Sequence, residues 1–497
     1  MVCVRYSEGI AESAEFRYDC TIGRNCRNRK PTAKRESMGL PKGTTEKLRK
    51  IAGEKGVLTS PVDLLTYSYD GTTNWEAKPE VVVFPTTTDQ VSEIMKLATQ
   101  DFIPVTVRGA GTNVSGGSIP VFGGIVLCTT RMNRIIAIDA ANFSATAEVG
   151  VVLHDLNQEI VKHRLFFPPD PQSFLAATLG GCVSENAGGP YAVKYGVFKH
   201  YLLGIRTVLP SGAIIDLGGK TMKNVTGYDL PQLICGSEGT LAVITQVTLR
   251  LLPLPQARQT VLAVFDNVVT AGETVQRIFA SGIMPAKIEL MDNWVIQRIE
   301  EVTPLGLPLT AEAILLFELD GMSEAVKKET EEVVDCCKKT GAIDVRPARD
   351  TNEAENFWTA RRAGFSAIFG NAPTVLAEDV TVPLNRIPEL IGRIRRCAQT
   401  YDLTIVIIGH AGDGNLHPAI LTNRKDPAHY ARAEKALDDI FAAALDLGGV
   451  LSGEHGIGLE KKRFLKQALP AEAINLLKEI KKVFDPKGIL NPGKIWE

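Results

Sequence analysis

Residues 108–117 read Arg-Gly-Ala-Gly-Thr-Asn-Val-Ser-Gly-Gly, the first of three glycine-rich blocks in the chain. It follows a run at Pro104–Val107 that predicts a strand, but it is too rich in glycine to be a helix or a strand. After Gly109 and Gly111, the third glycine position of the dinucleotide-binding fingerprint is Val114, so a phosphate site at a helix terminus is not indicated. Such a loop can instead turn backbone N–H groups inward as an anion nest suited to a pyrophosphate, or it can be a simple turn.

The chain around this loop alternates strand and helix patterns. Helices are predicted over Thr44–Gly56 and from Thr88, with Thr88 or Asp89 as the N-cap. Strands are predicted at Val81–Phe84, Ile125–Thr129, Ile135–Asp139, Ala145–Val149 and Leu241–Leu251.

Pro253 and Pro255 indicate a domain boundary. The segments that follow predict a strand–helix–strand–helix unit of the α+β sandwich kind: Val261–Phe265, Ala271–Ala280, Ile314–Leu319 and Ser323–Thr340. A strand at Leu403–Ile408 and a long helix near Pro427–Leu447 come next.

The composition points to a globular protein with a small-molecule partner. The 497 residues include 55 Lys and Arg against 57 Asp and Glu, a formal net charge of −2 that provides no basic field for nucleic acid. The nine cysteines include no CxxC pair, which argues against a disulfide framework, a zinc ribbon or an iron–sulfur cluster, and for a reducing compartment. No apolar run approaches the roughly 18–20 residues of a transmembrane helix. We expect a cytoplasmic protein, or one held at a membrane through a partner.

The N-terminal segment is basic and rich in Asn between Arg17 and Arg35. Glu8, Glu12 and Asp19 are unusual in a transit peptide, so we expect residues 1–40 to be a disordered tail.

Two further glycine-rich blocks occupy residues 178–189 and 236–239. Together, the segments RGAGTNVSGG (108–117), PPDPQSFLAATLGGCVSENAGG (168–189), KNVTGYDL (223–230) and CGSEGTLAVIT (235–245) resemble the FAD-linked oxidases with a flavin domain of the vanillyl-alcohol-oxidase or p-cresol-methylhydroxylase (PCMH) type. The resemblance runs from about Pro79 to Leu252 and continues to Lys494.

This resemblance implies an extended FAD lined by the glycine blocks. Residues implied near the pyrophosphate are Arg108, Gly109, Gly111, Thr112, Asn113, Ser115 and Gly117. Those implied along the cofactor are Pro169, Asp170, Thr178, Gly181, Ser184, Asn186 and Gly188, with Glu238, Gly239 and Ile244 near its adenine end. Some relatives attach the flavin covalently through a histidine in the first block; this block has none, so we expect non-covalent FAD.

A second chemical motif follows the strand at 403–408: Gly-His-Ala-Gly-Asp-Gly-Asn-Leu-His, residues 409–417. Asp413-Gly414 predicts a two-residue hairpin turn, which would set His410 opposite His417 with Cβ atoms about 4.5–5.5 Å apart. That spacing suits two ligands of one divalent metal, but two ordinary core or surface histidines would satisfy it equally well.

The segment Ser-Gly-Glu-His-Gly-Ile-Gly, residues 452–458, offers Glu454 as a third, oxygen ligand. His455 would lie beside the metal but point elsewhere, and it has the chemistry of a general base, although a turn histidine that caps backbone groups is the alternative.

Both motifs resemble the branch that contains D-lactate dehydrogenase, the flavoprotein subunit of glycolate oxidase and D-2-hydroxyglutarate dehydrogenase. The resemblance implies that His410, His417 and Glu454 bind a divalent metal, often zinc, and that His455 is the base. It also implies that Asn415 and Asn491 lie near the flavin and the substrate.

The same branch pairs the substrate carboxylate with an arginine shortly after Phe-Trp. Here Phe357-Trp358 precedes Arg361 and Arg362, and we favour Arg361, whose guanidinium fork suits a carboxylate; a helix-surface arginine is the alternative. The D-2-hydroxyglutarate enzymes place a lysine some residues later, whereas residues 375–379 offer Glu378 and Asp379. This departure favours lactate or glycolate.

The resemblance therefore implies a fold and a reaction. The expected fold is α+β, with a two-subdomain PCMH-type FAD-binding domain at 41–256, an α+β cap (substrate) domain at 257–450 and a C-terminal helical segment at 451–497 that returns to the flavin. The expected reaction is oxidation of a small D-2-hydroxy acid to the 2-oxo acid. Arg361 would hold the carboxylate, His455 would take the hydroxyl proton, and the hydride would pass to the flavin.

No ferredoxin-like cysteine set is present, so the electrons would pass to a separate acceptor, such as an electron-transfer flavoprotein or an iron–sulfur subunit. The alternatives are a non-catalytic FAD-binding subunit of a larger complex, an alkyl-transfer flavoenzyme of the same fold, or a carboxylate-binding module without turnover. A homodimer is left open.

Overall fold

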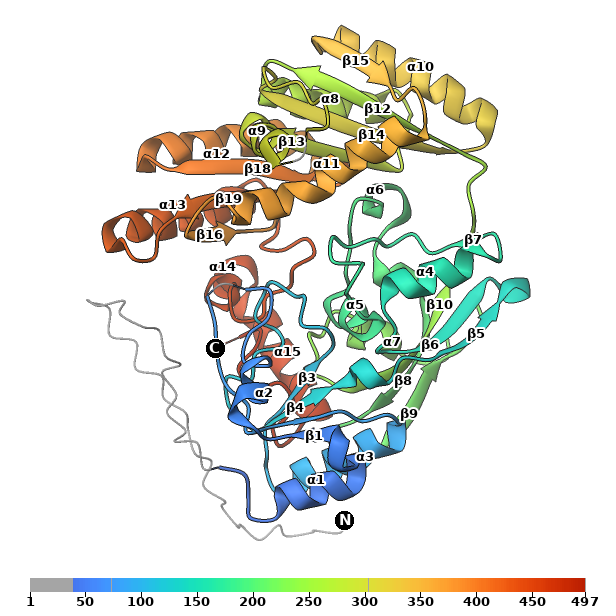
Figure 1. Ribbon diagram of the computed structural model, residues 1–497, viewed down its shortest axis with the longest axis vertical. Helices are drawn as coiled ribbons and strands as arrows, with labels where there is room; N and C mark the ends of the chain where they lie inside the picture. The colour runs from blue at the N-terminus through green and yellow to red at the C-terminus, as the bar shows by residue number, and fades with distance from the viewer. Residues whose placement is uncertain (1–38, 73, 303, 497) are drawn as a thin grey trace, which may run out of the picture. The chain divides into compact units, whose positions relative to one another are not determined.

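The structure, a computed structural model, describes residues 39–72, 74–302 and 304–496 (Figure 1). The chain divides into two units, Met1–Ser37 and Met38–Glu497, and the elements below belong to the second. All but the last two residues of the tail expected at 1–40 lie outside the described residues, so the tail stays a prediction.

A four-stranded sheet carries the first glycine block. Its strands, in the order β1-β2-β4-β3, are β1 (Val57–Leu58), β2 (Val81–Val83), β4 (Ile125–Cys128) and β3 (Val105–Arg108). β2 and β3 run parallel to β4. The helices of this region are α1 (Thr44–Ala52), α2 (Pro61–Leu65) and α3 (Thr88–Gln100). α1 and α3 bury Leu48, Val91 and Ile94 against the valines of the sheet.

The start of α3 corrects one expectation. The N-cap is Thr87, whose side chain accepts a hydrogen bond from Gln90 N, and not Thr88 or Asp89. Thr87 is the last residue with extended backbone angles, which is the geometry that an N-cap needs.

A five-stranded antiparallel sheet carries the second and third glycine blocks. Its strands, in the order β5-β6-β10-β8-β9, are β5 (Ile135–Asp139), β6 (Ser144–Glu148), β10 (Val243–Arg250), β8 (Leu202–Val208) and β9 (Ile214–Gly218). The helices nearby are α4 (Leu153–Val161), α5 (Leu179–Glu185), α6 (Ala192–Tyr195) and α7 (Leu230–Ile234). β7 (Leu165–Phe166) pairs with β11 (Leu252–Pro253). Leu156 of α4 and Val183 of α5 share a core with Val247 of β10.

An antiparallel sheet of eight strands follows Pro255. The order is β15-β12-β14-β13-β18-β19-β16, and β17 pairs with β19. The strands are β12 (Ala257–Phe265), β13 (Lys287–Asp292), β14 (Ala313–Gly321), β15 (Asp344–Pro347), β16 (Thr374–Ala377), β17 (Val380–Thr381), β18 (Thr404–His410) and β19 (Asn415–Thr422).

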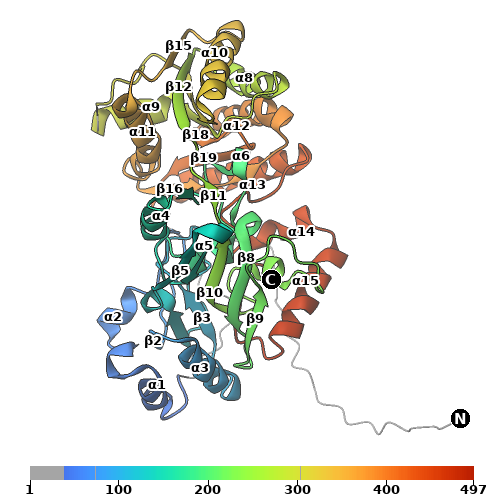
Figure 2. The ribbon, with the colours of Figure 1, turned by 90° about the vertical axis from the view of Figure 1, so that its right-hand side faces the viewer.

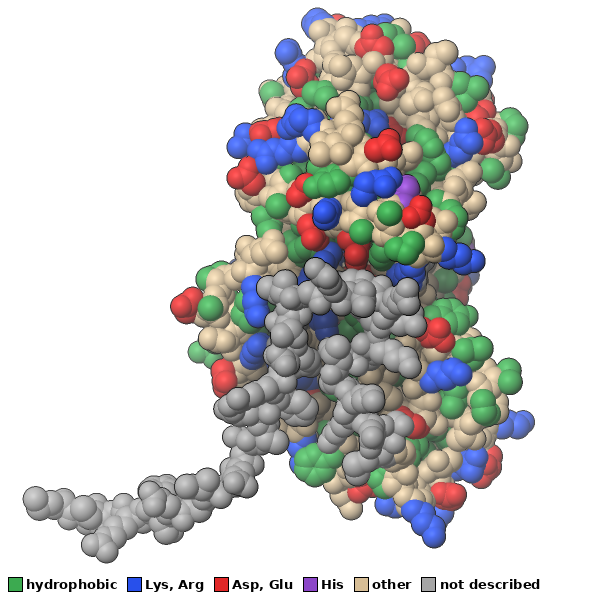
Figure 3. Space-filling model, turned by 90° about the vertical axis from the view of Figure 1, so that its left-hand side faces the viewer, with side chains coloured by type: hydrophobic (Ala, Val, Ile, Leu, Met, Phe, Trp, Pro, Cys, Tyr) green, Lys and Arg blue, Asp and Glu red, His purple; other side chains and the backbone are tan. Residues whose placement is uncertain are grey.

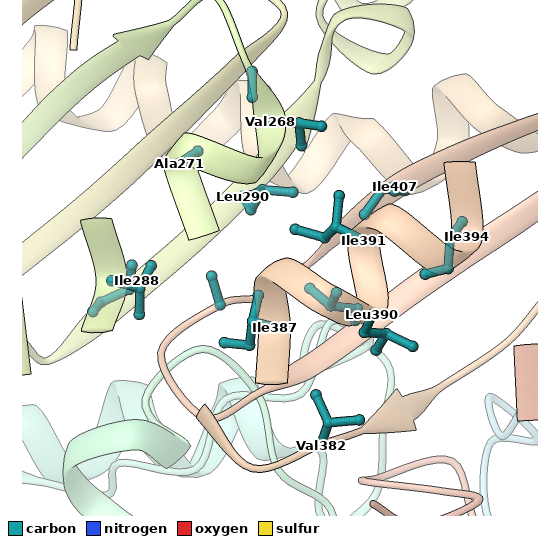
Figure 4. Close-up of a cluster of buried hydrophobic side chains, with 14 of the residues drawn as sticks. Val268, Ala271, Ile288, Leu290, Val382, Ile387, Leu390, Ile391, Ile394 and Ile407 are labelled. Carbon is teal, nitrogen blue, oxygen red and sulfur yellow. The ribbon is translucent and has the colours of Figure 1, made fainter. Parts of the chain in front are cut away.

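Helices cover both faces of this sheet. One face packs on α8 (Val268–Ala280), α10 (Ser323–Lys339), α12 (Ile387–Tyr401) and α13 (Pro427–Asp446). The opposite face packs on α9 (Asn293–Val302) and α11 (Thr351–Phe369). In Figure 4, Ile288 and Leu290 of β13 and Ile407 of β18 lie with the apolar side chains of α8 and α12. Because side chains alternate along a strand, the neighbouring positions Met291 and Ile408 face α9 and α11 instead.

The C-terminal segment returns to the glycine-rich region. This segment contains α14 (Leu465–Ala468) and α15 (Ala471–Phe484), and α15 lies beside the five-stranded sheet in Figure 2. Lys481 Nζ donates to Thr240 O over 2.7 Å, and Leu490 forms a parallel bridge with Val105. The predicted boundaries at 256/257 and 450/451 nevertheless remain a prediction.

The expected α+β class is confirmed, and the predicted strands and helices are present to within a few residues. The predicted strand–helix–strand–helix unit lacked one strand and one helix, because β13 and α9 lie between α8 and β14. On the face of Figure 3, acidic and basic side chains are interspersed over the atoms that are not grey. No helix among the described residues is long and apolar enough to cross a bilayer.

Candidate functional site

The first two glycine blocks meet face to face. A Cβ at Gly109 would collide with the Thr178 hydroxyl, so the close approach of the two segments requires glycine. Thr178 is the N-cap of α5, and its Oγ1 accepts a hydrogen bond from Gly181 N. The second block therefore begins a helix.

Arg108 supports the first block from beneath. Its guanidinium donates to Tyr69 O over 2.7 Å and lies under Gly111, whose φ of +74° and lack of a Cβ let the loop cross it. Arg108 does not line either of the cavities described next. The guanidinium of Arg108, expected near the pyrophosphate, thus contacts the loop itself.

Two adjoining cavities run along the blocks. The larger, of about 390 Å³, includes Thr112, Asn113, Thr178 and Gly181 among its lining residues. The smaller, of about 50 Å³, is lined by Gly109, Asn113, Gly117, Gly181, Ser184, Glu238, Gly239 and Ile244, among others. Asn113, Gly181 and Glu185 line both, so the two cavities adjoin at these residues.

The remaining residues predicted along the cofactor lie around these cavities without lining them. Pro169 is buried, and Asp170 accepts a hydrogen bond from Tyr191 N. Asn186 Oδ1 accepts from Lys199 N. Gly188 abuts Glu454, because a Cβ there would lie 3.2 Å from Glu454 Oε2.

The buried polar atoms beside the cavities that have no hydrogen-bond partner include Ser115 Oγ, Asn491 Oδ1 and Glu185 Oε2. The amide nitrogen of Asn491 donates to Gly117 O and Glu238 O, over 2.9 and 2.8 Å. Unsatisfied buried polar atoms are costly, so their presence along a glycine-lined cavity fits a polar ligand there.

Glu238 lines the smaller cavity and also contacts the segment that carries His455. Its carboxylate accepts hydrogen bonds from Ile457 N and Gly458 N, over 2.8 and 2.7 Å. It therefore holds the segment that carries His455, and its place at the adenine end of the cofactor stays a prediction.

The hairpin of β18 and β19 brings His410 and His417 together, but its predicted register was wrong. His410 pairs with Asn415, and His417 pairs with Ile408. The pairing of His410 with Asn415 leaves a loop of four residues, 411–414. Within it, Asp413 N donates to His410 O, and Asp413 Oδ1 accepts from Asn415 N. An offset of two residues keeps both histidines on the same face, where their ring centroids are 5.1 Å apart.

His410, His417 and Glu454 form a compact donor set. Their ligand atoms all lie within 4.8 Å of one another. Glu454 Oε1 lies 3.3 Å from His410 Nε2 and 3.4 Å from His417 Nε2. Burial raises the pKa of Glu454, but the neighbouring histidines outweigh burial and bring this pKa to about 2, so the carboxyl is ionised. Two imidazoles and one carboxylate fit a zinc-type site with an open position.

His455 lies against this cluster instead of pointing away from it. Its ring is stacked on that of His417, and its Nε2 is 4.0 Å from Glu454 Oε1. Burial lowers the pKa of His455, which favours the neutral imidazole that can accept a proton.

Asp379 holds the segment that carries Glu454 and His455. Its carboxylate accepts hydrogen bonds from Ser452 Oγ, Glu454 N and His455 N, over 2.6, 3.0 and 2.9 Å. Lys461 Nζ is 3.4 Å from the same carboxylate. In the sequence, Asp379 drew notice only as one of the residues found in place of a lysine.

Arg361 is buried, with 6% of its side chain exposed, and lines the larger cavity. Its Nε lies 2.7 Å from Glu289 Oε2. Arg362, by contrast, pairs with Glu355 on the helix surface. Glu289 also contacts His410, and sequence reasoning missed it together with β13. Asn415 is buried beside Gly453, and its Oδ1 has no partner.

The larger cavity thus joins Thr112, Thr178 and Gly181 to Arg361, to the donor set and to His455. Family models match two parts of the chain: "FAD binding domain" over residues 79–218 and "FAD linked oxidases, C-terminal domain" over 254–495. Glycolate oxidase subunit GlcD of Bacillus subtilis (strain 168) is 40% identical over 457 residues, 92% of this chain and 97% of the relative. The chain belongs to the FAD-linked oxidase family.

Other relatives agree with this assignment. The GlcD subunit of Escherichia coli (strain K12) is 39% identical over 88% of each chain. D-lactate dehydrogenase of Archaeoglobus fulgidus is 39% identical over 84% of this chain and 91% of the relative. This FAD-linked oxidase is therefore an FAD-dependent oxidoreductase.

Solved structures show the same fold at lower identity. p-Cresol methylhydroxylase has a TM-score of 0.77 at 20% identity, covering 92% of this FAD-linked oxidase and 98% of the neighbour. Alkyldihydroxyacetonephosphate synthase has a TM-score of 0.73 at 20% identity, covering 92% and 86%. At this identity the likeness concerns the PCMH-type fold alone.

Proposed function

We propose that this FAD-linked oxidase is a dehydrogenase that oxidises a small D-2-hydroxy acid, D-lactate or glycolate, to the 2-oxo acid. One observation carries the proposal: Arg361, the donor set of His410, His417 and Glu454, and His455 line the same cavity as the glycine blocks. A carboxylate-binding cation, a Lewis-acid site and a base within one cavity are what this reaction needs.

The glycine blocks fit non-covalent FAD. The close approach at Gly109 and the unpartnered atoms of Ser115 and Asn491 favour a polar cofactor along the cavities. The first block has no histidine to form a covalent link. When bound, FAD supplies the acceptor of the substrate hydride.

The donor set fits a divalent metal, and we propose zinc. His410, His417 and Glu454 would be its ligands, with a position left for substrate oxygen atoms. The ion would polarise the substrate hydroxyl and lower its pKa.

The side chains of the chain divide the remaining work. Arg361 binds the substrate carboxylate through its guanidinium fork. His455 Nε2 accepts the hydroxyl proton while the Cα hydride leaves. Asn415 and Asn491 contribute polar atoms near the reacting groups, since each has a buried side-chain oxygen without a partner.

The surroundings of Arg361 favour a short substrate. Phe365, Ile368, Phe369 and Ala377 line the cavity with apolar surface, and Glu378 adds a carboxyl. A second substrate carboxylate would meet these groups without a lysine among the lining residues. Lactate and glycolate carry only one carboxylate.

The relatives support the substrate class, because they are named for glycolate oxidase and D-lactate dehydrogenase. Two of them are named as subunits, which is consistent with a partner protein. We propose that the electrons leave to a separate protein, an electron-transfer flavoprotein or an iron–sulfur subunit, and that the enzyme works in the cytoplasm or at a membrane through that partner.

The test is anaerobic addition of D-lactate, L-lactate, glycolate and D-2-hydroxyglutarate to the FAD-loaded protein, followed by the yellow flavin absorbance. We expect bleaching by D-lactate or glycolate. An unbleached flavin with every 2-hydroxy acid would overturn the proposal and favour a non-catalytic subunit or an alkyl-transfer enzyme.

A further inference from the structure

A carboxylate with no assigned role lies behind the site. Glu289 is in the middle of β13, and its side chain is fully buried. Its strand neighbours Ile288 and Leu290 face α8 and α12, so alternation turns Glu289 toward α11, where Arg361 lies. His410 is on the adjacent strand and pairs directly with Glu289 in the register of β13 and β18.

Each oxygen of Glu289 meets one of two site residues. Oε1 lies 2.7 Å from His410 Nδ1, and Oε2 lies 2.7 Å from Arg361 Nε. A buried charge is retained only with partners, and here both partners line the larger cavity.

We propose that Glu289 is a positioning residue that orients His410 toward the metal and Arg361 toward the substrate carboxylate at once. The inference rests on the proposed function, because it takes His410 as a ligand and Arg361 as the carboxylate site. It adds a link between metal binding and substrate binding through one side chain.

The contact with His410 fixes its tautomer. In the metal-bound protein, a hydrogen bond from Nδ1–H to Glu289 would direct the Nε2 lone pair toward the ion, on the side where Glu454 Oε1 lies 3.3 Å from Nε2. Carboxylates that hold a ligand histidine in this way typically change metal affinity 10- to 100-fold when they are replaced.

The contact with Arg361 fixes its guanidinium. Arg361 Nε lies 2.7 Å from Glu289 Oε2 as an ion pair without hydrogen-bond geometry, so the contact holds the guanidinium by charge and leaves the two terminal nitrogens as a fork for a ligand carboxylate. A glutamine at position 289 could still accept from His410, but its amide group would then face Arg361 as a second donor.

β13 supplies a matched control. Asp292 is also fully buried, pairs with Arg395 over 3.2 Å and accepts from Ile407 N over 2.8 Å, but it does not line the cavity. Asp292→Asn therefore removes a buried carboxylate from the same strand without touching the proposed link.

The experiment compares wild type, Glu289→Gln and Asp292→Asn as FAD-loaded protein stripped of metal. Zn²⁺ affinity is measured by calorimetry, and pyruvate affinity by the perturbation of the oxidised flavin spectrum. For Glu289→Gln we expect Zn²⁺ to bind about 10- to 100-fold more weakly and pyruvate to bind more weakly, with a melting temperature no lower than that of Asp292→Asn. Asp292→Asn should bind both ligands like wild type.

If wild type binds Zn²⁺ and Glu289→Gln binds both Zn²⁺ and pyruvate with the wild-type affinities, the inference is overturned and the proposed function is left intact. A wild type that binds no Zn²⁺ would instead count against the proposed metal site. If Glu289→Gln does not fold, Glu289→Asp carries the same expectation, because its shorter side chain keeps the charge but cannot span both partners.

Discussion

The imidazole of His455 is stacked on that of His417, with ring centroids 5.2 Å apart and planes 10° apart. The residue proposed as the base thus lies directly against a proposed metal ligand. A hydroxyl bound at the open position of the donor set would come within reach of His455 Nε2, which is 4.0 Å from Glu454. The proposed proton acceptor and the proposed Lewis-acid site would therefore serve the same substrate oxygen.

Replacing His455 by Ala should slow the bleaching of FAD by substrate about 10²- to 10⁴-fold, the usual contribution of a general base. FAD should remain bound, because His455 is not part of the glycine blocks. Stopped-flow absorbance measures the rate. His429→Ala is the control, since His429 bonds Thr422 away from the cavity. An unchanged rate in His455→Ala would remove the base from the mechanism.

Arg361→Ala and Arg362→Ala form a matched pair on one helix. Arg361 lines the cavity, whereas Arg362 pairs with the exposed Glu355. Loss of charge-assisted hydrogen bonds costs about 1.5–3 kcal/mol, so the KM for D-lactate or glycolate should rise about 10- to 150-fold in Arg361→Ala. Arg362→Ala should keep the wild-type KM. Equal KM values in the two variants would contradict the carboxylate site.

Metal removal tests the donor set. Dialysis against a chelator should abolish bleaching, and Zn²⁺ should restore it and raise the melting temperature, because a ligand of the folded state stabilises that state. His417→Ala should lose this restoration at the same Zn²⁺ concentration. A chelated enzyme that keeps its full rate would show that the reaction needs no metal.

Asp379→Asn should disturb the segment of Glu454 and His455. The change removes the carboxylate 3.4 Å from the buried Lys461, which keeps Glu378 at 3.9 Å. We expect a loss of stability of up to about 3–5 kcal/mol and weaker Zn²⁺ binding. Glu148→Gln is the control, because Glu148 is buried and paired with Arg134 but lies outside the cavities. It should lower the melting temperature only. Wild-type Zn²⁺ affinity in a folded Asp379→Asn would contradict the positioning role of Asp379.

Asp292 predicts a pH dependence of stability. Burial raises the pKa of Asp292 to about 6 in the folded protein, above the roughly 3.9 of an unfolded chain. The folded state therefore favours protonated Asp292, and this stabilisation is fully present below about pH 4. It is lost as pH rises through about 6, a change on the order of 2–3 kcal/mol in the free energy of unfolding. Asp292→Asn lacks this change, so its melting temperature relative to wild type should rise from pH 4 to pH 7. A constant difference would contradict the raised pKa.

The sequence predicted the parts of the site that lie within short segments. The glycine loop at 108–117 was recognisable because few backbones tolerate that composition, and His410 and His417 were placed on one face by strand alternation. Both histidines remain on one face despite the wrong register, because the loop is two residues longer than predicted and side chains alternate every two residues along a strand. Arg361 was distinguished from Arg362 only through the resemblance.

The contacts that hold the site together could not be read from the sequence. β13 was missed because its short apolar core is interrupted by Glu289. The proposed role of that carboxylate depends on two contacts distant in sequence: His410 lies 121 residues further along the chain, and Arg361 lies on α11. Asp379 likewise acts on residues 452–455 across the fold. Thr178 was not predicted as a helix cap, since Gly180 and Gly181 are poor helix formers.

The central claim is that one cavity removes a proton and a hydride from a 2-hydroxy acid. It is tested most directly by anaerobic single turnover of D-lactate with hydrogen or deuterium at C2, measuring flavin bleaching and pyruvate together. The account predicts one pyruvate per FAD reduced and slower bleaching with deuterium; should glycolate be the substrate, the same holds with glyoxylate. Bleaching without 2-oxo acid, or no bleaching with either substrate, would contradict it.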